Sequence, residues 1–93
     1  MDSWCVYMIL CDDSSLYTGI TNDIERRMDA HASQRGAKYF RGRSPAALVY
    51  LESGHNRSTA SKREAAIKKL SRQEKCELLH ANTNEVTTKS IQL

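Results

Sequence analysis

The segments WCVYMILC at residues 4–11, DDSS at 12–15 and LYTGI at 16–20 decide the fold. The first segment is apolar, contains β-branched and aromatic residues and lacks glycine and proline, which is typical of a buried strand. The second segment has the composition of a tight turn, and the third returns to residues that favour strands. The sequence therefore predicts an antiparallel β-hairpin.

The length of the hairpin loop determines which side chains share a face of the sheet. With a three-residue loop, odd positions pair with odd positions, and Tyr7 and Tyr17 lie on the same face. With a four-residue loop, these two tyrosines point to opposite faces. The sequence leaves both registers open.

A helix is expected directly after the hairpin. Asn22 is a suitable N-cap, and Glu25 stands three residues later, as a capping box requires. The helical period then places Arg27 and His31 on the stripe that faces the sheet, whereas Arg26 lies off this stripe. An arginine and a histidine are thus expected to point inward.

The second half of the chain predicts one more strand and two more helices. After a loop at 32–46, the expected elements are a strand at 47–52, a helix from about 58 to 70 and a short helix from the Ser71–Glu74 capping box to about His80. Glu64 lies on the inward stripe of the second helix, between Ala60 and Ile67. These elements predict a mixed α/β (α+β) fold, a small three-stranded antiparallel sheet flanked by helices.

The length and composition indicate one small globular domain in a chain of 93 residues. The domain is expected to span residues 1–80, and the polar, aperiodic residues 81–93 are expected to form a flexible tail. No apolar run is long enough to cross a membrane. The three cysteines lack the spacing of a metal site, and free thiols in the cytoplasm are the simpler interpretation.

The charge is distributed unevenly, although the net charge is only +3. Segment 35–43 (RGAKYFRGR) has four basic residues and no acidic residue, and segment 57–75 has seven basic residues against two acidic ones. A polyanion such as nucleic acid would therefore contact the middle and the C-terminal half of the chain. The alternative is that both segments are simply solvated surface.

Five polar side chains are predicted to point inward or to share one face of the sheet: Tyr7, Tyr17, Arg27, His31 and Glu64. A small core tolerates a buried charge only when the charge is paired or binds a ligand. A structural salt bridge between Arg27 and Glu64 is one explanation, and ordinary half-exposed tyrosines and histidine are another. A site is the third, because arginine binds phosphate through its planar fork, one carboxylate with waters suits Mg²⁺, and tyrosine can act as a base.

The spacing of these residues resembles the signature of the GIY-YIG nucleases. The first tyrosine occurs in CVY at 5–7 and the second in YTG at 17–19, and an arginine and a histidine follow at positions 27 and 31. Glu64, within KREAAIKKL at 62–70, is similar to the family's later helical glutamate. The resemblance covers roughly residues 4–76.

Two longer runs are similar to particular members of this family. GAKYFRGRSP at 36–45 and REAAIKKLSR at 63–72 look like the short single-domain GIY-YIG proteins of bacteria and the catalytic part of a nuclease subunit that cuts branched DNA. The resemblance implies a metal-dependent endonuclease acting on DNA, rather than RNA, in repair or recombination on branched or damaged substrates. It also implies the family's α/β sandwich around a three-stranded sheet.

The resemblance further implies a role for each site residue. Glu64 would hold a divalent metal ion, Mg²⁺ or Mn²⁺, and Arg27 would bind the scissile phosphate. One of Tyr7 and Tyr17 would activate the attacking water while the other contacts a phosphate oxygen, and His31 would orient a tyrosine. The expected nucleic-acid contacts are Lys38, which would assist at the phosphate, and Arg41, Arg43 and Lys68.

The sequence departs from the family pattern in three respects. The motifs read CVY and YTG, so only the tyrosines and Gly19 are kept. The asparagine that some members have near the end of the domain has no clear counterpart. No appended DNA-binding domain is recognisable, so a partner protein is expected to supply substrate specificity. The alternative function is a nucleic-acid-binding or partner-recruiting module with weak or no cleavage.

Overall fold

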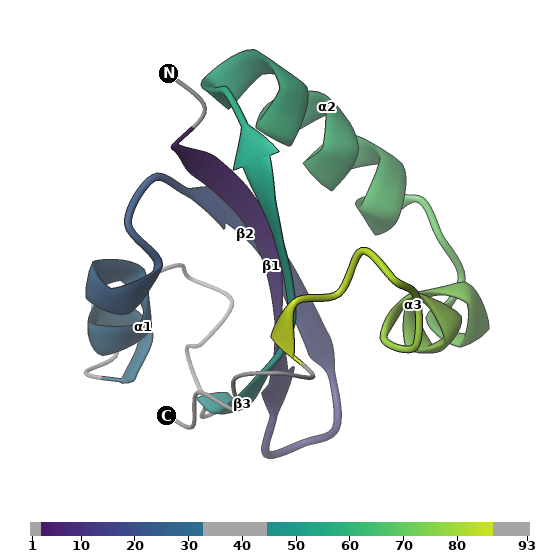
Figure 1. Cartoon of the computed structure of the whole chain (residues 1–93). Coiled ribbons are helices and arrows are strands. Elements are labelled where there is room, and N and C mark those ends of the chain that lie inside the picture. The colour runs from purple at the N-terminus through teal and green to yellow at the C-terminus, as the bar shows by residue number, and fades with distance from the viewer. Residues whose placement is uncertain (1–2, 33–44, 87–93) are drawn as a thin grey trace.

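The computed structural model describes residues 3–32 and 45–86, without the side chains of residues 31 and 32. Its elements are β1 (Trp4–Cys11), β2 (Leu16–Thr21), α1 (Ile24–Ala32), β3 (Pro45–His55), α2 (Arg57–Lys68) and α3 (Arg72–Leu78) (Figure 1). The three strands form one antiparallel sheet in the order β2-β1-β3. The predicted fold class is confirmed.

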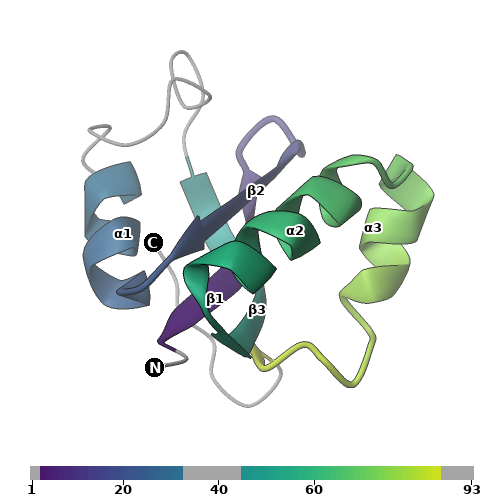
Figure 2. The same ribbon diagram turned by 90° about the horizontal axis from the view of Figure 1, so that it is seen from above.

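The helices cover both faces of the sheet. Figures 1 and 2 show α1 on one face, and α2 and α3 on the other. β1 is the central strand and is therefore enclosed on both sides, with five consecutive buried residues. This enclosure explains why residues 4–11 are apolar throughout and do not alternate with polar residues. Among the described residues, no helix is long and apolar enough to span a bilayer.

The hairpin adopts the register of the three-residue loop. Cys11 N–H donates to Ser15 O and Ser14 N–H donates to Cys11 O, both at 2.9 Å. Ser14 has a φ of 68°, the left-handed conformation that such loops require. Tyr7 consequently pairs with Gly19, and Ile9 pairs with Tyr17. Both tyrosines lie on the face that α1 covers.

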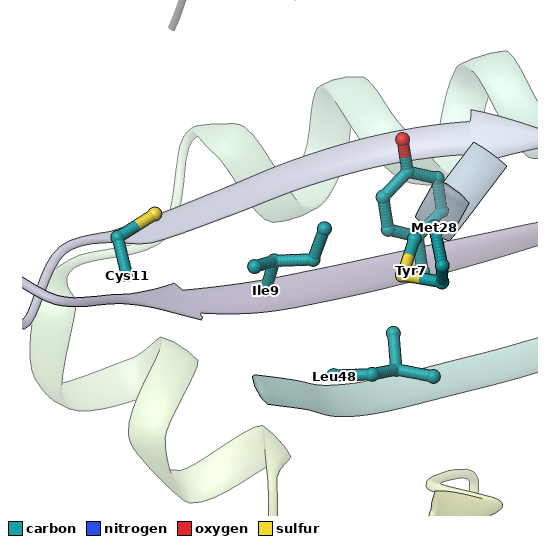
Figure 3. Packing of buried hydrophobic residues seen from close by; sticks show 5 residues of the cluster. All are labelled: Tyr7, Ile9, Cys11, Met28 and Leu48. Atoms are coloured by element: carbon teal, nitrogen blue, oxygen red, sulfur yellow. The ribbon is translucent and has the colours of Figure 1, made fainter. Parts of the chain in front are cut away.

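Each face of the sheet has its own apolar core. The α1 side contains Tyr7, Ile9, Cys11, Met28 and Leu48, and the α2 side contains Val6, Met8, Tyr50, Ala60 and Ile67 (Figure 3 shows the first set). Burying each large apolar side chain contributes about 1.5–3 kcal/mol. The inward positions predicted for α2, Ala60 and Ile67, are both fully buried.

The first helix begins one residue later than predicted. Asp23, not Asn22, is the capping residue, because its Oδ1 accepts the N–H of Arg26 at 3.2 Å. The Thr21 hydroxyl accepts the N–H of Asp23 at 3.1 Å, which forms a turn before the helix. Because of this turn, α1 starts one residue later than expected. The cap at Asp23 stands in place of the expected capping box between Asn22 and Glu25.

The remaining elements agree with the prediction except at their ends. β3 is longer than expected, at residues 45–55 rather than 47–52, because pairing continues from Trp4 with His55 to Cys11 with Pro45. α2 has Asn56 as its N-cap, and α3 has the predicted Ser71–Glu74 capping box.

A carboxylate at the end of β3 attaches α2 to the sheet. Glu52 accepts hydrogen bonds from Tyr50 Oη at 2.5 Å, from His55 Nε2 at 2.7 Å and from Arg63 Nε at 3.2 Å. Its side chain is only 13% exposed. Burial alone would raise the pKa of Glu52, but the hydrogen bonds from Tyr50 and His55, with the charge of Arg63, hold this pKa below its ordinary value.

The segment after α3 differs from the flexible tail predicted from residue 81. Residues 81–86 lie against β3, and Asn84 is buried among them (7% exposed). Asn84 Nδ2 donates to the carbonyls of Val49 and Leu79 at 2.9 Å, while Oδ1 accepts the N–H groups of Leu51 and Val86. The sequence does not predict this attachment, because hydrogen bonds, and not a periodic apolar stripe, hold the segment against β3.

The same segment covers the outer edge of β3. Glu85 N–H donates to Leu51 O at 2.9 Å, and the Glu85 carboxylate accepts from Ser53 N–H at 2.7 Å. Thr83 contacts the Tyr50 hydroxyl at 2.8 Å on the α2 side, whereas Val86 packs on the α1 side. The segment thus crosses the sheet edge and satisfies backbone groups there. Residues 87–93 lie outside the described part of the chain.

We expect Glu52→Gln to reduce the acid sensitivity of the fold. The carboxylate has a lowered pKa in the folded state, so its stabilising effect is complete above its unfolded value of about 4.3 and is lost as the pH falls through the folded value. The difference in unfolding free energy between wild type and variant should therefore be largest near neutral pH and shrink below about pH 4. Urea unfolding at several pH values measures it. Glu77→Gln, at an exposed position of α3, is the control, and a pH-independent difference for Glu52→Gln would contradict the assignment.

We expect Asn84→Ala to destabilise the protein by roughly 2–4 kcal/mol, because it leaves buried backbone groups of β3 and of the 81–86 segment without partners. Asn82→Ala, at an exposed position two residues away, should change stability by less than about 0.5 kcal/mol. Denaturant unfolding monitored at Trp4 gives both values. Similar effects of the two substitutions would show that the 81–86 segment is not held by Asn84.

Candidate functional site

Tyr7 lies under the candidate site and is fully buried (0% exposed). Its ring passes over the backbone of Gly19 on the neighbouring strand, and Figure 3 shows the hydroxyl directed toward β2. A Cβ atom at position 19 would lie only 2.6 Å from the Tyr7 hydroxyl and 2.7 Å from Cζ. Gly19 is therefore required because the tyrosine ring occupies the space of a side chain.

Arg27 meets Tyr7 from the first half of α1. Its Nε donates to the Tyr7 hydroxyl at 3.3 Å. This hydrogen bond, more than the charge interactions that also favour the cation, raises the pKa of Arg27 above its ordinary value despite partial burial. The guanidinium is thus a permanent cation whose Nε is held by Tyr7, and a planar guanidinium is suited to binding phosphate oxygens.

Tyr17 completes this group from β2. Its ring centroid lies 6.1 Å from that of Tyr7, with the ring planes tilted by 47°. Unlike Tyr7, it is only partly buried. Burial raises the pKa of Tyr7 well above its ordinary range, and the hydrogen bond from Arg27 offsets only part of this effect. Burial thus favours the neutral form of the Tyr7 hydroxyl that contacts Arg27, and Tyr17 is the more exposed of the two tyrosines.

An open pocket adjoins Arg27 on the solvent side. It is formed where the β2–α1 turn meets the first turns of the helix, and it is lined by Thr21, Asn22, Asp23, Arg26, Arg27 and Ala30. Two arginines in one pocket make it suited to an anionic group. The structure thus brings three of the predicted site residues together, Tyr7, Tyr17 and Arg27, and Arg27 also lines the pocket.

Glu64 lies in α2, on the opposite face of the sheet from α1 (Figure 2). Its side chain is 23% exposed and forms an ion pair with Lys68, with 3.4 Å between Nζ and Oε2. The alternative of a structural salt bridge between Arg27 and Glu64 is therefore wrong for this fold. β2 is an edge strand, and α2 contacts both β2 and the central strand β1.

A hard divalent cation would have Glu64 as its protein ligand. Within residues 3–32 and 45–86, no group of three or more His, Cys, Asp or Glu side chains forms a ready-made metal site. A single, partly exposed carboxylate fits Mg²⁺ or Mn²⁺ only if waters and substrate phosphate oxygens supply the remaining ligands, which is a common arrangement for Mg²⁺. The ion pair with Lys68 is exposed and costs little to break.

One hydroxyl on the α2 side lacks a partner in the described structure. Thr18 is 3% exposed, and its Oγ1 is buried without a hydrogen bond. Thr18 pairs with Met8 of β1, so it points to the face that α2 covers. The middle residue of the YTG motif is therefore part of the α2-side core and not of the tyrosine and arginine group.

Several predicted residues fall outside the described side chains. His31 lies in α1, but its side chain is not described, and Lys38, Arg41 and Arg43 belong to the undescribed range 33–44. Lys68 is exposed on α2. Sequence reasoning missed Asn84, a buried asparagine near the end of the domain, because nothing in its local sequence signals long-range contacts with β3.

We expect Gly19→Ala to cost about 1–3 kcal/mol, because the added methyl group displaces the buried Tyr7 ring. In a Tyr7→Leu background the same substitution should be neutral or stabilising, since alanine is better than glycine in a strand when no ring opposes it. Denaturant unfolding of the four proteins gives the coupling energy between the two positions. An equal cost in both backgrounds would show that the close approach does not constrain position 19.

Comparison with known proteins agrees with this geometry. Residues 3–77 match the model of the GIY-YIG catalytic domain. A UPF0213 protein of Clostridium perfringens is 49% identical over 78 residues, which cover 84% of each chain. A UPF0213 protein of Desulfotalea psychrophila is 51% identical over 81 residues, covering 86% of this chain and 74% of that protein.

Two structures determined by NMR in solution are also similar. The UPF0213 protein of Bacillus halodurans is 41% identical, with a TM-score of 0.57 over 92% of this chain and 94% of that one. A protein of E. faecalis is also 41% identical, with a TM-score of 0.58 over 86% and 88%. The CVY and YTG motifs, the arginine of α1 and these similarities lead to one conclusion: the chain belongs to the GIY-YIG family of nuclease domains, within the group of UPF0213 proteins.

Proposed function

We propose that this protein is a metal-dependent endonuclease that hydrolyses phosphodiester bonds in DNA. The observation that carries the proposal is the guanidinium of Arg27, which is held at Nε by the buried Tyr7 hydroxyl while the side chain lines an open pocket. A cation fixed in this way is preorganised for the charge that develops on a phosphate during hydrolysis. Membership of a nuclease family supports the same conclusion.

The reaction assigns different work to the two tyrosines. A water oxygen attacks the phosphorus, the bond to the leaving oxygen breaks, and the water loses a proton while the leaving oxygen gains one. Tyr17, which is partly exposed, stands beside the attacking water. Tyr7, which is fully buried, positions Arg27 through its hydroxyl and does not exchange protons with the substrate.

Glu64 is the residue that we propose to hold Mg²⁺ or Mn²⁺. When bound, such an ion neutralises phosphate charge and stabilises the leaving oxygen. Because Glu64 and Arg27 belong to helices on opposite faces of the sheet, the scissile strand would pass over the edge at β2, the strand that carries Tyr17 and that α2 contacts. On binding, Lys68 would exchange its contact with Glu64 for a phosphate oxygen.

The substrate contacts beyond this centre are proposed from sequence. Lys38, Arg41 and Arg43 would bind the backbone of DNA, His31 would orient a tyrosine, and a partner protein would select branched or damaged substrates for repair or recombination. The cytoplasm is the compartment that we propose for this work.

The test is nicking of a supercoiled plasmid and of a branched duplex, with and without Mg²⁺ or Mn²⁺. Arg27→Ala, Tyr17→Phe and Glu64→Gln should each lower kcat by about 10²-fold or more, because each removes a group that acts only in the transition state. Glu64→Gln should also leave stability within about 0.5 kcal/mol of wild type, since its ion pair with Lys68 is exposed. Glu77→Gln, on the surface of α3, should cleave like wild type.

Two outcomes would reject the proposal. Equal residual cleavage in the Arg27 and Glu64 variants would indicate a contaminating nuclease. DNA binding without cleavage, weakened by salt and by loss of Arg41 and Arg43 but not of Glu64, would instead establish a nucleic-acid-binding module. Basic segments separate from the pocket are the observation that favours this second function.

A further inference from the structure

We infer that the pocket at the start of α1 binds the phosphate next to the scissile phosphate, with Arg26 as its main contact. This inference rests on the proposed function, because Arg27 is assigned there to the scissile phosphate. Arg26 belongs to neither tyrosine motif, and its exposed position would ordinarily make it a solvated residue. The pocket gives it a second role.

Arg26 and Arg27 line the same pocket from two sides. Consecutive residues of a helix are separated by about 100° around the axis, so the two guanidinium groups cannot bind one oxygen from the same direction. Arg27 is partly buried and held by Tyr7, whereas Arg26 is exposed. The pocket therefore has one partly buried cation, Arg27, which Tyr7 holds, and one exposed cation, Arg26.

The polar groups around the rim leave donors available. The backbone N–H of Asp23 donates a hydrogen bond to the Thr21 hydroxyl, and the backbone N–H of Arg26 donates one to Asp23 Oδ1. The guanidinium of Arg26 has no ion pair with any described residue, and the exposed Asn22 also lines the pocket. Asp23 repels an anion, but its contact with a backbone N–H compensates part of its charge.

The acidic residues of α1 limit the anion to this side of the helix. Glu25 and Asp29 are exposed, and the helical period places both on the flank of Arg26 that faces away from Arg27. Neither residue lines the pocket. A nucleic-acid strand that contacts Arg27 and then Arg26 would therefore meet the carboxylates of Glu25 and Asp29 on the far side of Arg26. The geometry fits a strand with two successive phosphates at the two arginines and no further phosphate along α1.

The first measurement is the affinity for a short fluorescent duplex, in EDTA so that no cleavage occurs, at salt concentrations from 50 to 200 mM. Each phosphate contact contributes about 0.9 to the slope of log affinity against log salt, so Arg26→Ala should reduce this slope by about one. Over that salt range the variant should lose roughly threefold less affinity than wild type does. Glu77→Gln, which changes one exposed charge on α3 outside the basic segments, should keep the wild-type slope.

The second measurement separates a neighbouring phosphate from the scissile one. Arg26→Ala should raise KM for DNA cleavage at least threefold and leave kcat within about twofold, since a ground-state contact is lost. A slope for Arg26→Ala equal to the wild-type slope would overturn the inference while leaving the nuclease proposal intact. A fall in kcat as large as that of Arg27→Ala would also overturn it, because Arg26 would then act at the reacting phosphate. Wild-type protein that neither binds nor cuts DNA would reject the proposed function itself.

Discussion

The enclosure of β1 between two helical layers is the constraint on which the rest of the structure depends. β1 is the middle strand of a three-stranded sheet, and it supplies the centre of both apolar cores. In so small a domain there is little other surface to bury. The helices are therefore fixed by what they cover on this strand: Met28 of α1 on one face, and Ala60 and Ile67 of α2 on the other.

The candidate site uses that same enclosure. The ring of Tyr7 is buried in the apolar core. Its hydroxyl lies next to the backbone of Gly19 and accepts a hydrogen bond from Arg27, so the same residue belongs to the candidate site. A rigid core thus determines where the guanidinium lies, and the hydrogen bond that Arg27 donates to a buried hydroxyl keeps its orientation without neutralising its charge. This arrangement explains why one of two similar tyrosines suits positioning and the other suits contact with water.

The sheet also divides the site. Tyr17 and Arg27 lie on the α1 face, whereas Glu64 lies in the helix that covers the other face. α2 is held in place by the Glu52 cluster, in which Arg63, the residue before Glu64, binds the carboxylate at the end of β3. Under the proposed function, a substrate strand crosses the edge at β2 and so joins the two halves. The small size of the domain makes such a short path possible.

The sequence alone determined the order of strands and helices, the inward stripe of α2, and the spacing of tyrosines, arginine and glutamate, because these follow from local periodicity and from residue chemistry. Tertiary structure decided the hairpin register, through a left-handed Ser14, and hence that the tyrosines share a face. It placed Arg27 with Tyr7 rather than with Glu64, and it attached residues 81–86 to β3 through Asn84. These features depend on contacts between residues far apart in the chain, and local sequence patterns carry no record of which distant partner a polar group will meet.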